Sequence, residues 1–210
     1  MTEDLWRYEL KLQADGVVHL AGVDEVGRGP LAGPVVAAAV IFPPAKRWHE
    51  VFPTLRESKQ LTARQREELY EMICQAAVAV GIGEVDVEYI DKYNILQATR
   101  AAMRQAILKL KVVPDYVLID AVWIEGLSCP VEAITHGDKR CASIAAASII
   151  AKVYRDRLMV KWDQTYPGYG FARNKGYGTP EHLAALTRLG PCPLHRFSFK
   201  PVRLAQEAMN

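Results

Sequence analysis

Two adjacent carboxylates, Asp24 and Glu25, end an apolar run and are followed at once by a Gly- and Pro-rich turn around one arginine. The apolar runs 17–23 and 35–42 are predicted to be buried strands, so this segment is expected to form a hairpin with acids at its root. Paired carboxylates beside a buried strand are unfavourable unless one is protonated, a basic side chain pairs with them, or cations bind. Arg28 could be that basic partner, so ion pairing and metal binding both remain open from this segment alone.

Two further acids stand where structural elements end or begin. Asp120 closes a short β-branched run, and Asp138 precedes an Ala-rich stretch that is predicted to be a helix. Taken singly, Asp120 fits a strand-ending turn and Asp138 fits a helix N-cap. If a mixed sheet brings both to one edge with the first pair, the four carboxylates form an all-oxygen site suited to Mg²⁺ or Mn²⁺.

Periodicity and capping patterns predict the elements that must position these acids. After the hairpin, helices and strands alternate, and the chain ends in a basic helical region, which is typical of an α/β protein with a mixed sheet. Residues 1–15 are expected to be a polar lead-in. Strands are predicted at 78–85, 116–120 and 131–135, and helices are predicted after Thr62, after Asn94, over 143–157 and from Thr179 to Gly190.

Composition limits the class of protein. The 210 residues are half apolar and about a quarter charged, which suits a globular chain with one sizeable core. No apolar run reaches the roughly 20 residues of a membrane span, and the acidic start Met1-Thr2-Glu3-Asp4 is unlike a secretory signal, so a cytoplasmic protein is expected. The four cysteines are widely spaced and indicate neither a zinc cluster nor a disulfide framework.

Charge is unevenly distributed along the chain. Residues 151–203 hold ten Lys or Arg against three Asp or Glu, a net +7, whereas the rest of the chain carries −5. This asymmetry favours a polyanion whose phosphates are held by the basic part, although a solvated basic helix face gives the same pattern. The five histidines include no metalloprotease or triad spacing, and only His136 lies near a candidate acid. The glycine-rich turn lacks the Gly-Lys-Ser/Thr ending of a P-loop.

Taken in order, these segments resemble the ribonuclease HII family over about residues 18–199. Two positions differ from the family pattern: Glu57 stands where Asp often precedes Ser-Lys, and Ala121 stands where Gly often follows the strand aspartate. Only about twenty residues precede Asp24, which favours HII over the related ribonuclease HIII with its long N-terminal extension. The matching motifs are Asp24-Glu25-x-Gly27-Arg28-Gly29-Pro30-Leu31-Ala32-Gly33-Pro34, Ser58-Lys59-x-Leu61, Leu118-Ile119-Asp120, Gly137-Asp138 with 143–156, Lys175-Gly176-Tyr177-Gly178-Thr179 and His195-Arg196-x-Ser198-Phe199.

The resemblance implies a ribonuclease H-like fold, a five-stranded mixed sheet flanked by helices with a small helical C-terminal region. It divides the chain into a catalytic core, 1–160, and a basic helical region, 161–210, packed on that core. The implied activity is cleavage of the RNA strand of RNA/DNA hybrids and incision 5′ to single ribonucleotides in duplex DNA, leaving 3′-hydroxyl and 5′-phosphate ends. The enzyme is expected to be a monomer.

The resemblance also implies roles for particular residues. Asp24, Glu25, Asp120 and Asp138 would hold two divalent cations, Mg²⁺ or Mn²⁺, for an in-line displacement. Gly27, Arg28 and Gly29 would let backbone groups reach a ribose 2′-hydroxyl, because glycines have no Cβ. Tyr177 would stack on the neighbouring deoxyribose, although it could instead pack under the helix start at Thr179. Candidate phosphate contacts are Lys59, Arg155, Lys175 and Arg196.

Two other classes of protein remain open at this level. A different metal nuclease or strand-transfer enzyme of the same fold, such as a resolvase or integrase, would act on a DNA junction rather than on ribonucleotides. A nucleic-acid-binding module with an inactive site would bind without metal and would not cleave.

Overall fold

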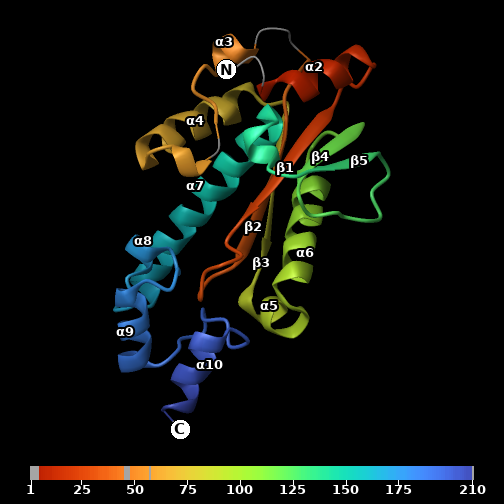
Figure 1. The fold of residues 1–210 in the computed structure, drawn as a ribbon. Coiled ribbons are helices and arrows are strands. Elements are labelled where there is room, and N and C mark those ends of the chain that lie inside the picture. Colours follow the sequence, from red (N-terminus) through yellow and green to blue (C-terminus); the bar gives the residue numbers. More distant parts are fainter. Residues whose placement is uncertain (1–4, 45–47, 57, 210) are drawn as a thin grey trace.

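A five-stranded mixed sheet in the order β3-β2-β1-β4-β5 forms the centre of the computed structural model, which describes residues 5–44, 48–56 and 58–209 (Figure 1). The central strand β1 pairs antiparallel with β2 and parallel with β4. The α/β fold expected from the sequence is therefore confirmed. The strands are β1 Leu20–Val26, β2 Val35–Ile41, β3 Ala79–Val85, β4 Tyr116–Asp120 and β5 Val131–Ile134.

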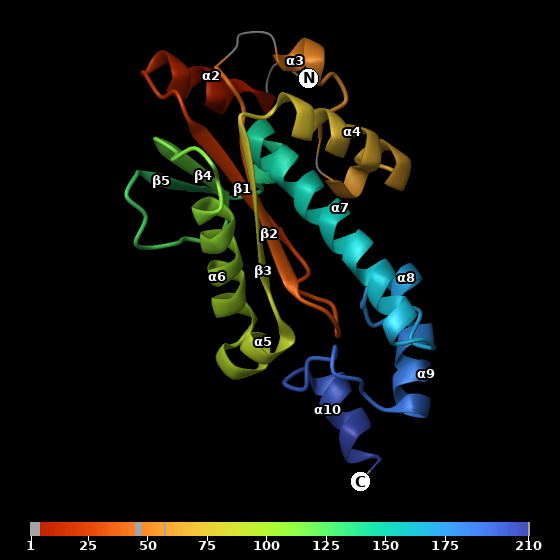
Figure 2. The ribbon, with the colours of Figure 1, turned by 180° about the vertical axis from the view of Figure 1, so that it is seen from behind.

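Helices cover both faces of the sheet. Strand β2 is buried along its whole length, and its side chains alternate between two apolar clusters. Val36, Ala38 and Val40 face α4 and α7, whereas the alternate residues face α6, and Figure 2 shows α6 and α7 on opposite sides of the sheet. The helices are α2 Arg7–Ala14, α3 Trp48–Val51, α4 Ala63–Ala76, α5 Val87–Tyr93, α6 Ile95–Leu108, α7 Ala142–Thr165, α8 Phe171–Asn174, α9 Pro180–Leu189 and α10 Lys200–Glu207.

Several helix starts agree with the sequence analysis. Thr62 and Gln65 form the reciprocal capping box at α4, and the Asn94 side chain accepts from two backbone amides at the start of α6. Thr179 caps α9, with Pro180 in its first turn and Gly190 after its end. These caps depend on local chemistry, which explains why they can be read from the sequence.

The N-terminal segment is not the polar lead-in that we expected. Helix α2 follows the buried residues Leu5 and Trp6, and Trp6 lies in an aromatic cluster with Phe42 and Phe52. The polar sequence of this segment hid the helix, because only a narrow side of α2 is buried and most of its residues can be polar. Strand β1 also begins at Leu20 rather than at residue 17, because the Val18 and His19 amides donate to Asp115 instead of a neighbouring strand.

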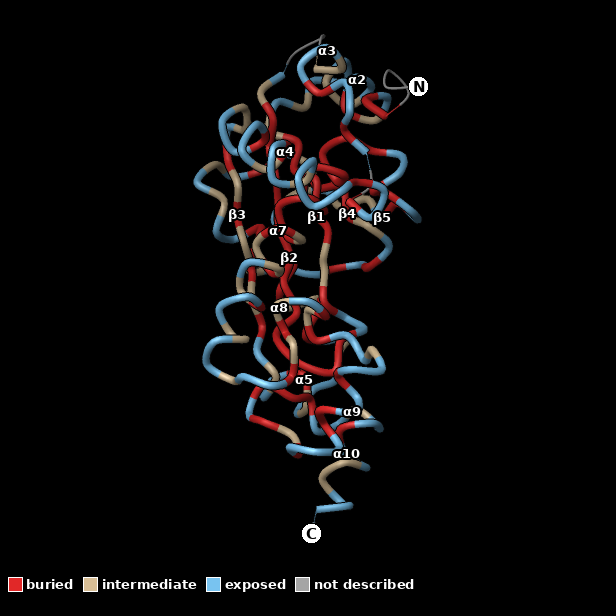
Figure 3. Tube along the Cα trace, turned by 90° about the vertical axis from the view of Figure 1, so that its left-hand side faces the viewer, coloured by how far each residue is buried: buried red, intermediate tan, exposed pale blue. Residues whose placement is uncertain are grey.

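The C-terminal helices lie at the opposite end of the molecule from α2 (Figure 1). Helix α7 runs from the sheet towards α8 and α9, and the predicted boundary at residue 160 falls inside it. The division of the chain at that residue remains a prediction. Figure 3 shows the buried residues concentrated along the sheet and α7. Within the described ranges, no helix combines the length and apolar character that a membrane span requires.

Candidate active site

Asp24 lies within β1 rather than after it, because the strand continues to Val26. It pairs with Ala38 across the sheet, so its side chain lies on the α7 face. Gly22, on the same face, has no room for a Cβ because the Ser143 backbone occupies that space, which brings α7 close to the sheet. The Asp24 side chain is only 5% exposed, and its Oδ1 accepts from the Glu25 amide at 2.7 Å.

Asp120 is tied directly to the turn that carries Asp138. It is the last residue of β4, and its Oδ1 accepts from the Gly137 amide at 2.7 Å. A Cβ on Gly137 would lie 2.6 Å from Ile144 Cδ1 and 3.4 Å from that same aspartate oxygen, so glycine allows this close approach. Ala121, one of the departures from the family pattern, has a φ of 51°, a left-handed conformation that glycine adopts at less cost.

Asp138 is not the N-cap of α7. It lies in the 3₁₀ helix Gly137–Lys139 and is 8% exposed, whereas α7 begins at Ala142 after Cys141. The cap is supplied instead by Glu9 of α2, whose Oε1 accepts from the Ser143 amide at 2.7 Å. Asp138 is therefore buried beside the sheet for a reason other than helix capping.

Electrostatics show that the four acids form one cluster. Burial raises the pKa of Asp24 well above its ordinary value, and the neighbouring charges of Glu25, Asp120 and Asp138 raise it further. Burial also raises the pKa of Glu25, while Arg28 opposes that rise. The Arg28 Nη1 lies 3.4 Å from Glu25 Oε1 and this arginine side chain is 46% exposed, so its ion pair offsets only part of the repulsion.

The cluster has the chemistry of a divalent-cation site. All four side chains offer carboxylate oxygens, which hard cations prefer, and Glu25 Oε2 is buried without a hydrogen-bond partner among the described residues. Within the same residues, no group of three or more His, Cys, Asp or Glu side chains is arranged to hold a metal ion. The fit is therefore one of donor chemistry, and Asp24, Glu25, Asp120 and Asp138 are the residues that would hold the metal.

Two buried arginines hold the loop between β1 and β2. Arg155 of α7 donates to the carbonyl oxygens of Pro34, Lys175 and Ala32 at 2.8 to 3.0 Å. Arg196 donates to the carbonyl oxygens of Gly27, Arg28 and Gly33 at 2.5 to 3.0 Å. Both side chains are fully buried, so the expected phosphate contacts of Arg155 and Arg196 are wrong for this structure.

Arg196 also determines which way the Gly27-Arg28-Gly29 backbone points. In a trans peptide unit the N–H points away from the C=O, and none of the described peptide bonds is cis. Because the carbonyls of Gly27 and Arg28 face Arg196, the amides of Arg28 and Gly29 point away from it. Arg196 therefore orients the amides that the sequence predicts as ribose contacts.

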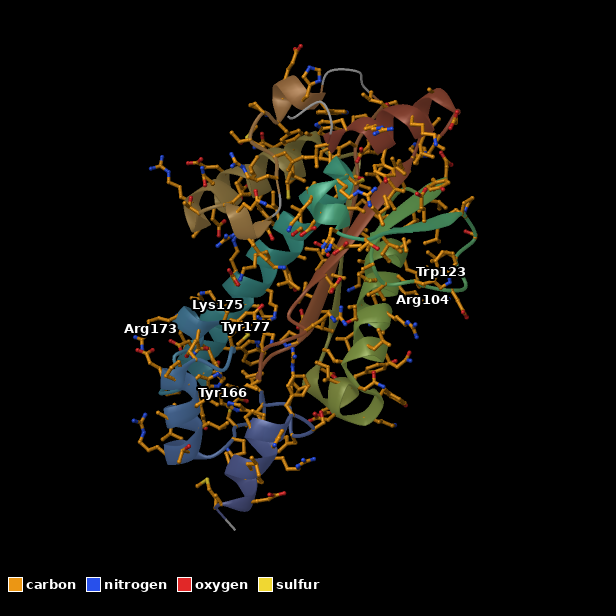
Figure 4. The ribbon with its side chains drawn as sticks, in the orientation of Figure 1. Arg104, Trp123, Tyr166, Arg173, Lys175 and Tyr177 are labelled. Carbon is orange, nitrogen blue, oxygen red and sulfur yellow. The ribbon has the colours of Figure 1, made fainter. Side chains whose placement is uncertain are left out.

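Tyr177 lies beside this loop with an exposed ring. Its side chain is 41% exposed, and a methyl group on Gly29 would lie 3.7 Å from Tyr177 Cε1. Figure 4 shows Tyr177 and Lys175 together near the loop that joins β1 and β2. The Lys175 amino group donates to the Ala172 carbonyl oxygen, so this lysine is partly engaged within the protein. The structure thus brings Tyr177 to the Gly27-Arg28-Gly29 loop.

Comparison with known proteins identifies the family. The family model for ribonuclease HII matches residues 21–202. The ribonuclease HII of Acholeplasma laidlawii is 53% identical over 96% of this chain and 97% of its own, and that of Geobacter metallireducens is 51% identical over 95% and 92%. The crystal structure of the ribonuclease H2 from Pyrococcus horikoshii OT3 matches with a TM-score of 0.78 at 27% identity, covering 90% of this chain and 97% of that one.

The chain belongs to the ribonuclease HII family. It is therefore a nuclease of the ribonuclease H type, which acts on RNA/DNA hybrids and depends on divalent metal. Family membership decides against a resolvase or integrase and against a binding module without activity. The ribonuclease H-like sheet expected from the motifs is likewise confirmed.

The chain positions Tyr177 through a histidine pair that sequence reasoning did not find. His182 Nδ1 lies 2.9 Å from the Tyr177 carbonyl oxygen, and its Nε2 lies 3.0 Å from His195 Nε2. The carbonyl can only accept, so His182 Nδ1 carries a proton and His195 donates from Nε2. His195 Nδ1 then accepts from the Cys192 amide at 2.9 Å, so both rings are neutral.

The remaining predicted residues lie nearer the surface. Lys59 is exposed on the 3₁₀ helix Ser58–Gln60, which is joined to α7 by a 2.7 Å hydrogen bond between Ser58 and Ser148. His136 is exposed with a φ of 55°, just before the turn that carries Asp138. Glu57, the other departure from the family pattern, lies outside the described residues.

One signal could have revealed the roles of Arg155 and Arg196. A loop rich in Gly and Pro has many carbonyl oxygens that accept no hydrogen bond within a sheet or helix, and buried carbonyl oxygens need hydrogen-bond donors. Arginine, with five N–H groups, can supply several donors at once.

Proposed function

We propose that this member of the ribonuclease HII family incises duplex DNA 5′ to a single embedded ribonucleotide, in addition to cutting the RNA strand of hybrids. The products would carry 3′-hydroxyl and 5′-phosphate ends. The observation that carries this proposal is the exposed Tyr177 ring beside Gly29, in the loop that directly follows the β1 strand carrying Asp24 and Glu25. We expect Mg²⁺ or Mn²⁺ to support the reaction, and we expect the enzyme to act as a monomer in the cytoplasm.

In this mechanism the protein supplies positioning and charge. Asp24, Glu25, Asp120 and Asp138 would hold two divalent cations, which supply Lewis-acid activation of water and stabilisation of the leaving oxygen when bound. Asp120 is joined to the turn that carries Asp138 by the Gly137 hydrogen bond. Because the carboxylates are carried by β1, by β4 and by this joined turn, little reorganisation would be needed during the reaction.

Recognition of the ribonucleotide would come from the neighbouring loop. The amides of Arg28 and Gly29, oriented by Arg196, would donate to the 2′-hydroxyl, which is the group that distinguishes RNA from DNA. Tyr177 would stack against the deoxyribose on the 3′ side and would report the change from ribose to deoxyribose. Lys59 and Lys175 remain candidate phosphate contacts, which position the duplex without reading its bases.

The proposal is tested by mapping the nick on an end-labelled duplex that contains one ribonucleotide, with Mg²⁺ or Mn²⁺. The expected product is a single cut 5′ to the ribonucleotide, and an all-DNA duplex serves as the negative control. A long RNA/DNA hybrid shows whether the preparation is active. Cleavage of the hybrid without incision at the single ribonucleotide would contradict the proposal.

A further inference from the structure

Asp138 also lines a groove of about 870 Å³, and the proposed function gives this groove no role. Its walls come from α2, from residues 53–56 and Gln60 before α4, from Glu132 of β5, and from the turn 138–140. Helix α2 and the C-terminal helices lie at opposite ends of the molecule (Figure 1). The groove therefore extends the active site towards α2, whereas Tyr177 extends it towards the C-terminal helices.

The charged side chains among the described lining of the groove are mainly basic. Its acidic members are Glu132 and Asp138, and the Glu132 carboxylate accepts from the Tyr116 hydroxyl. Ligand pockets for small molecules are mostly apolar, so this lining indicates an extended anion instead. The basic lining residues, all exposed, are Arg7, Lys11, Arg56, Lys139 and Arg140.

Arg7 and Lys11 are one helical turn apart on α2, so their side chains share one face of that helix. Arg140 is held in place by Tyr8, whose hydroxyl accepts from Arg140 Nη2 at 2.7 Å. The cations of the groove thus come from separate elements that converge beside one active-site carboxylate.

The wall formed by α2 is fixed relative to the acidic cluster. Glu9 is buried on α2, and its Oε1 accepts from Cys141 Sγ at 3.0 Å and from the Ser143 amide at 2.7 Å. Both partners lie at the start of α7, directly after the turn that carries Asp138. A ligand held by α2 would therefore keep a defined distance from the scissile phosphate.

We propose that this groove binds the sugar–phosphate backbone of the duplex on the 5′ side of the scissile bond. The direction rests on the proposed function, in which Tyr177 contacts the deoxyribose on the 3′ side. Backbone phosphates match the groove because they are negatively charged, repeat along the strand and need no base-specific partner. The sequence shows no sign of this surface, because it is a local basic cluster within the part of the chain that is acidic overall.

The test removes two groove charges in the variant Arg7→Gln/Lys11→Gln. The matched control is Lys109→Gln/Lys111→Gln, which removes two exposed charges at the end of α6, on the opposite face of the sheet from α7. Kinetics are measured on single-ribonucleotide duplexes and on RNA/DNA hybrids with a long or short duplex arm on either side of the cut.

The groove variant should raise KM about tenfold on long 5′-arm substrates and leave kcat unchanged, and the slope of log KM against log salt should fall by about two. Shortening the 5′ arm should raise the wild-type KM and remove the difference between wild type and variant. Shortening the 3′ arm should preserve that difference. The control variant should change KM by less than about twofold, because its lost charges lie away from the duplex.

Equal KM values for the groove and control variants on long 5′ arms would overturn the proposal. It would also be overturned if shortening the 3′ arm, rather than the 5′ arm, removed the KM difference between wild type and the groove variant. The hybrid substrates separate this result from the proposed function. If the KM difference between wild type and the groove variant does not depend on the 5′ arm, but incision at single ribonucleotides is normal, only the groove proposal is rejected. If that dependence on the 5′ arm is seen with hybrids but single ribonucleotides are not incised, only the single-ribonucleotide activity is rejected.

Discussion

The acidic cluster at the edge of the sheet and the buried arginines beneath the β1–β2 loop carry opposite charges and are satisfied to very different degrees. Asp24 and Asp120 each receive one backbone amide, and burial together with the neighbouring carboxylates raises the pKa of Asp24 well above its ordinary value. Arg155 and Arg196 each donate to three carbonyl oxygens. Burial lowers their pKa values to about 10 and about 9, so both remain charged at neutral pH.

The difference shows how buried charge is divided between structure and activity. The N–H groups of the two arginines are hydrogen-bonded to carbonyl oxygens of the protein's own backbone, so these charged side chains stabilise the conformation of the loop. The carboxylates are left with mutual repulsion that Arg28 offsets only in part and that protons or bound cations can relieve further. The predictions below test whether the two clusters respond to substitution and to pH in these opposite ways.

The largest effect is expected from Asp24→Asn. The amide is nearly isosteric and can still accept from the Glu25 amide, but it is a poorer cation ligand, so kcat/KM should fall at least about a thousandfold. A carboxyl whose folded pKa is raised loses stability as pH increases through that pKa, so the variant should melt at a higher temperature than wild type at pH 7 without metal. Near-normal turnover or a lower melting temperature would contradict this account.

Arg196→Gln should lower stability, whereas Asp24→Asn should raise it. Three loop carbonyls would lose their donors, so the free energy of unfolding should fall by about 3 to 4 kcal/mol. Denaturant unfolding measures this change, and Arg173→Gln, which alters an exposed arginine paired with Glu181, is the control that should cost little. Arg196→Lys should not restore stability, because one ammonium group cannot reproduce the planar set of donors. Full stability of Arg196→Gln would show that the loop does not depend on this residue.

The histidine pair predicts an acid-sensitive C-terminal region. Burial and the neighbouring His182 lower the pKa of His195 to about 4, below its ordinary value of 6.5. The unfolded chain therefore binds more protons between these values, and stability should be complete above pH 6.5 and should decline by up to about 3 kcal/mol towards pH 4. Melting temperatures measured across this range should show a smaller decline in His195→Gln than in wild type. An identical decline in both proteins would argue against this pair.

The smallest of these effects is expected from Tyr177→Ala. Loss of stacking worth about 1 to 3 kcal/mol should reduce incision at a single ribonucleotide about ten- to a hundredfold, while the melting temperature hardly changes because the ring is already exposed. Tyr177→Phe should retain more activity, since it keeps the ring. If Tyr177→Ala unfolds the protein, or leaves single-ribonucleotide incision intact, recognition rests on Gly27, Arg28 and Gly29 instead.

Sequence predicted the parts of this fold that depend on local chemistry. Residues 116–120 form β4 with the expected bounds, and Asn94 and Thr179 cap helices as expected. Only the alternative interpretation of Asp138 as an N-cap fails, because an acid before an Ala-rich run resembles a cap, whereas Glu9 of another helix accepts from the Ser143 amide. The two arginines were misassigned because exposure of a basic side chain depends on distant carbonyls, which the local sequence does not show.

The central position of β1 has a consequence for the order of events during folding. Its pairing with β2 is local, as Gly22 opposite Val40 shows, whereas its pairing with β4 joins Ala21 to Val117. Distant contacts cost more loop-closure entropy, so this pairing is expected to be completed after the transition state for folding. Asp24 and Asp120 come together only through that distant pairing, so their repulsion is expected mainly to speed unfolding and hardly to slow folding. Cations bound at the finished site would then lengthen the lifetime of the native state.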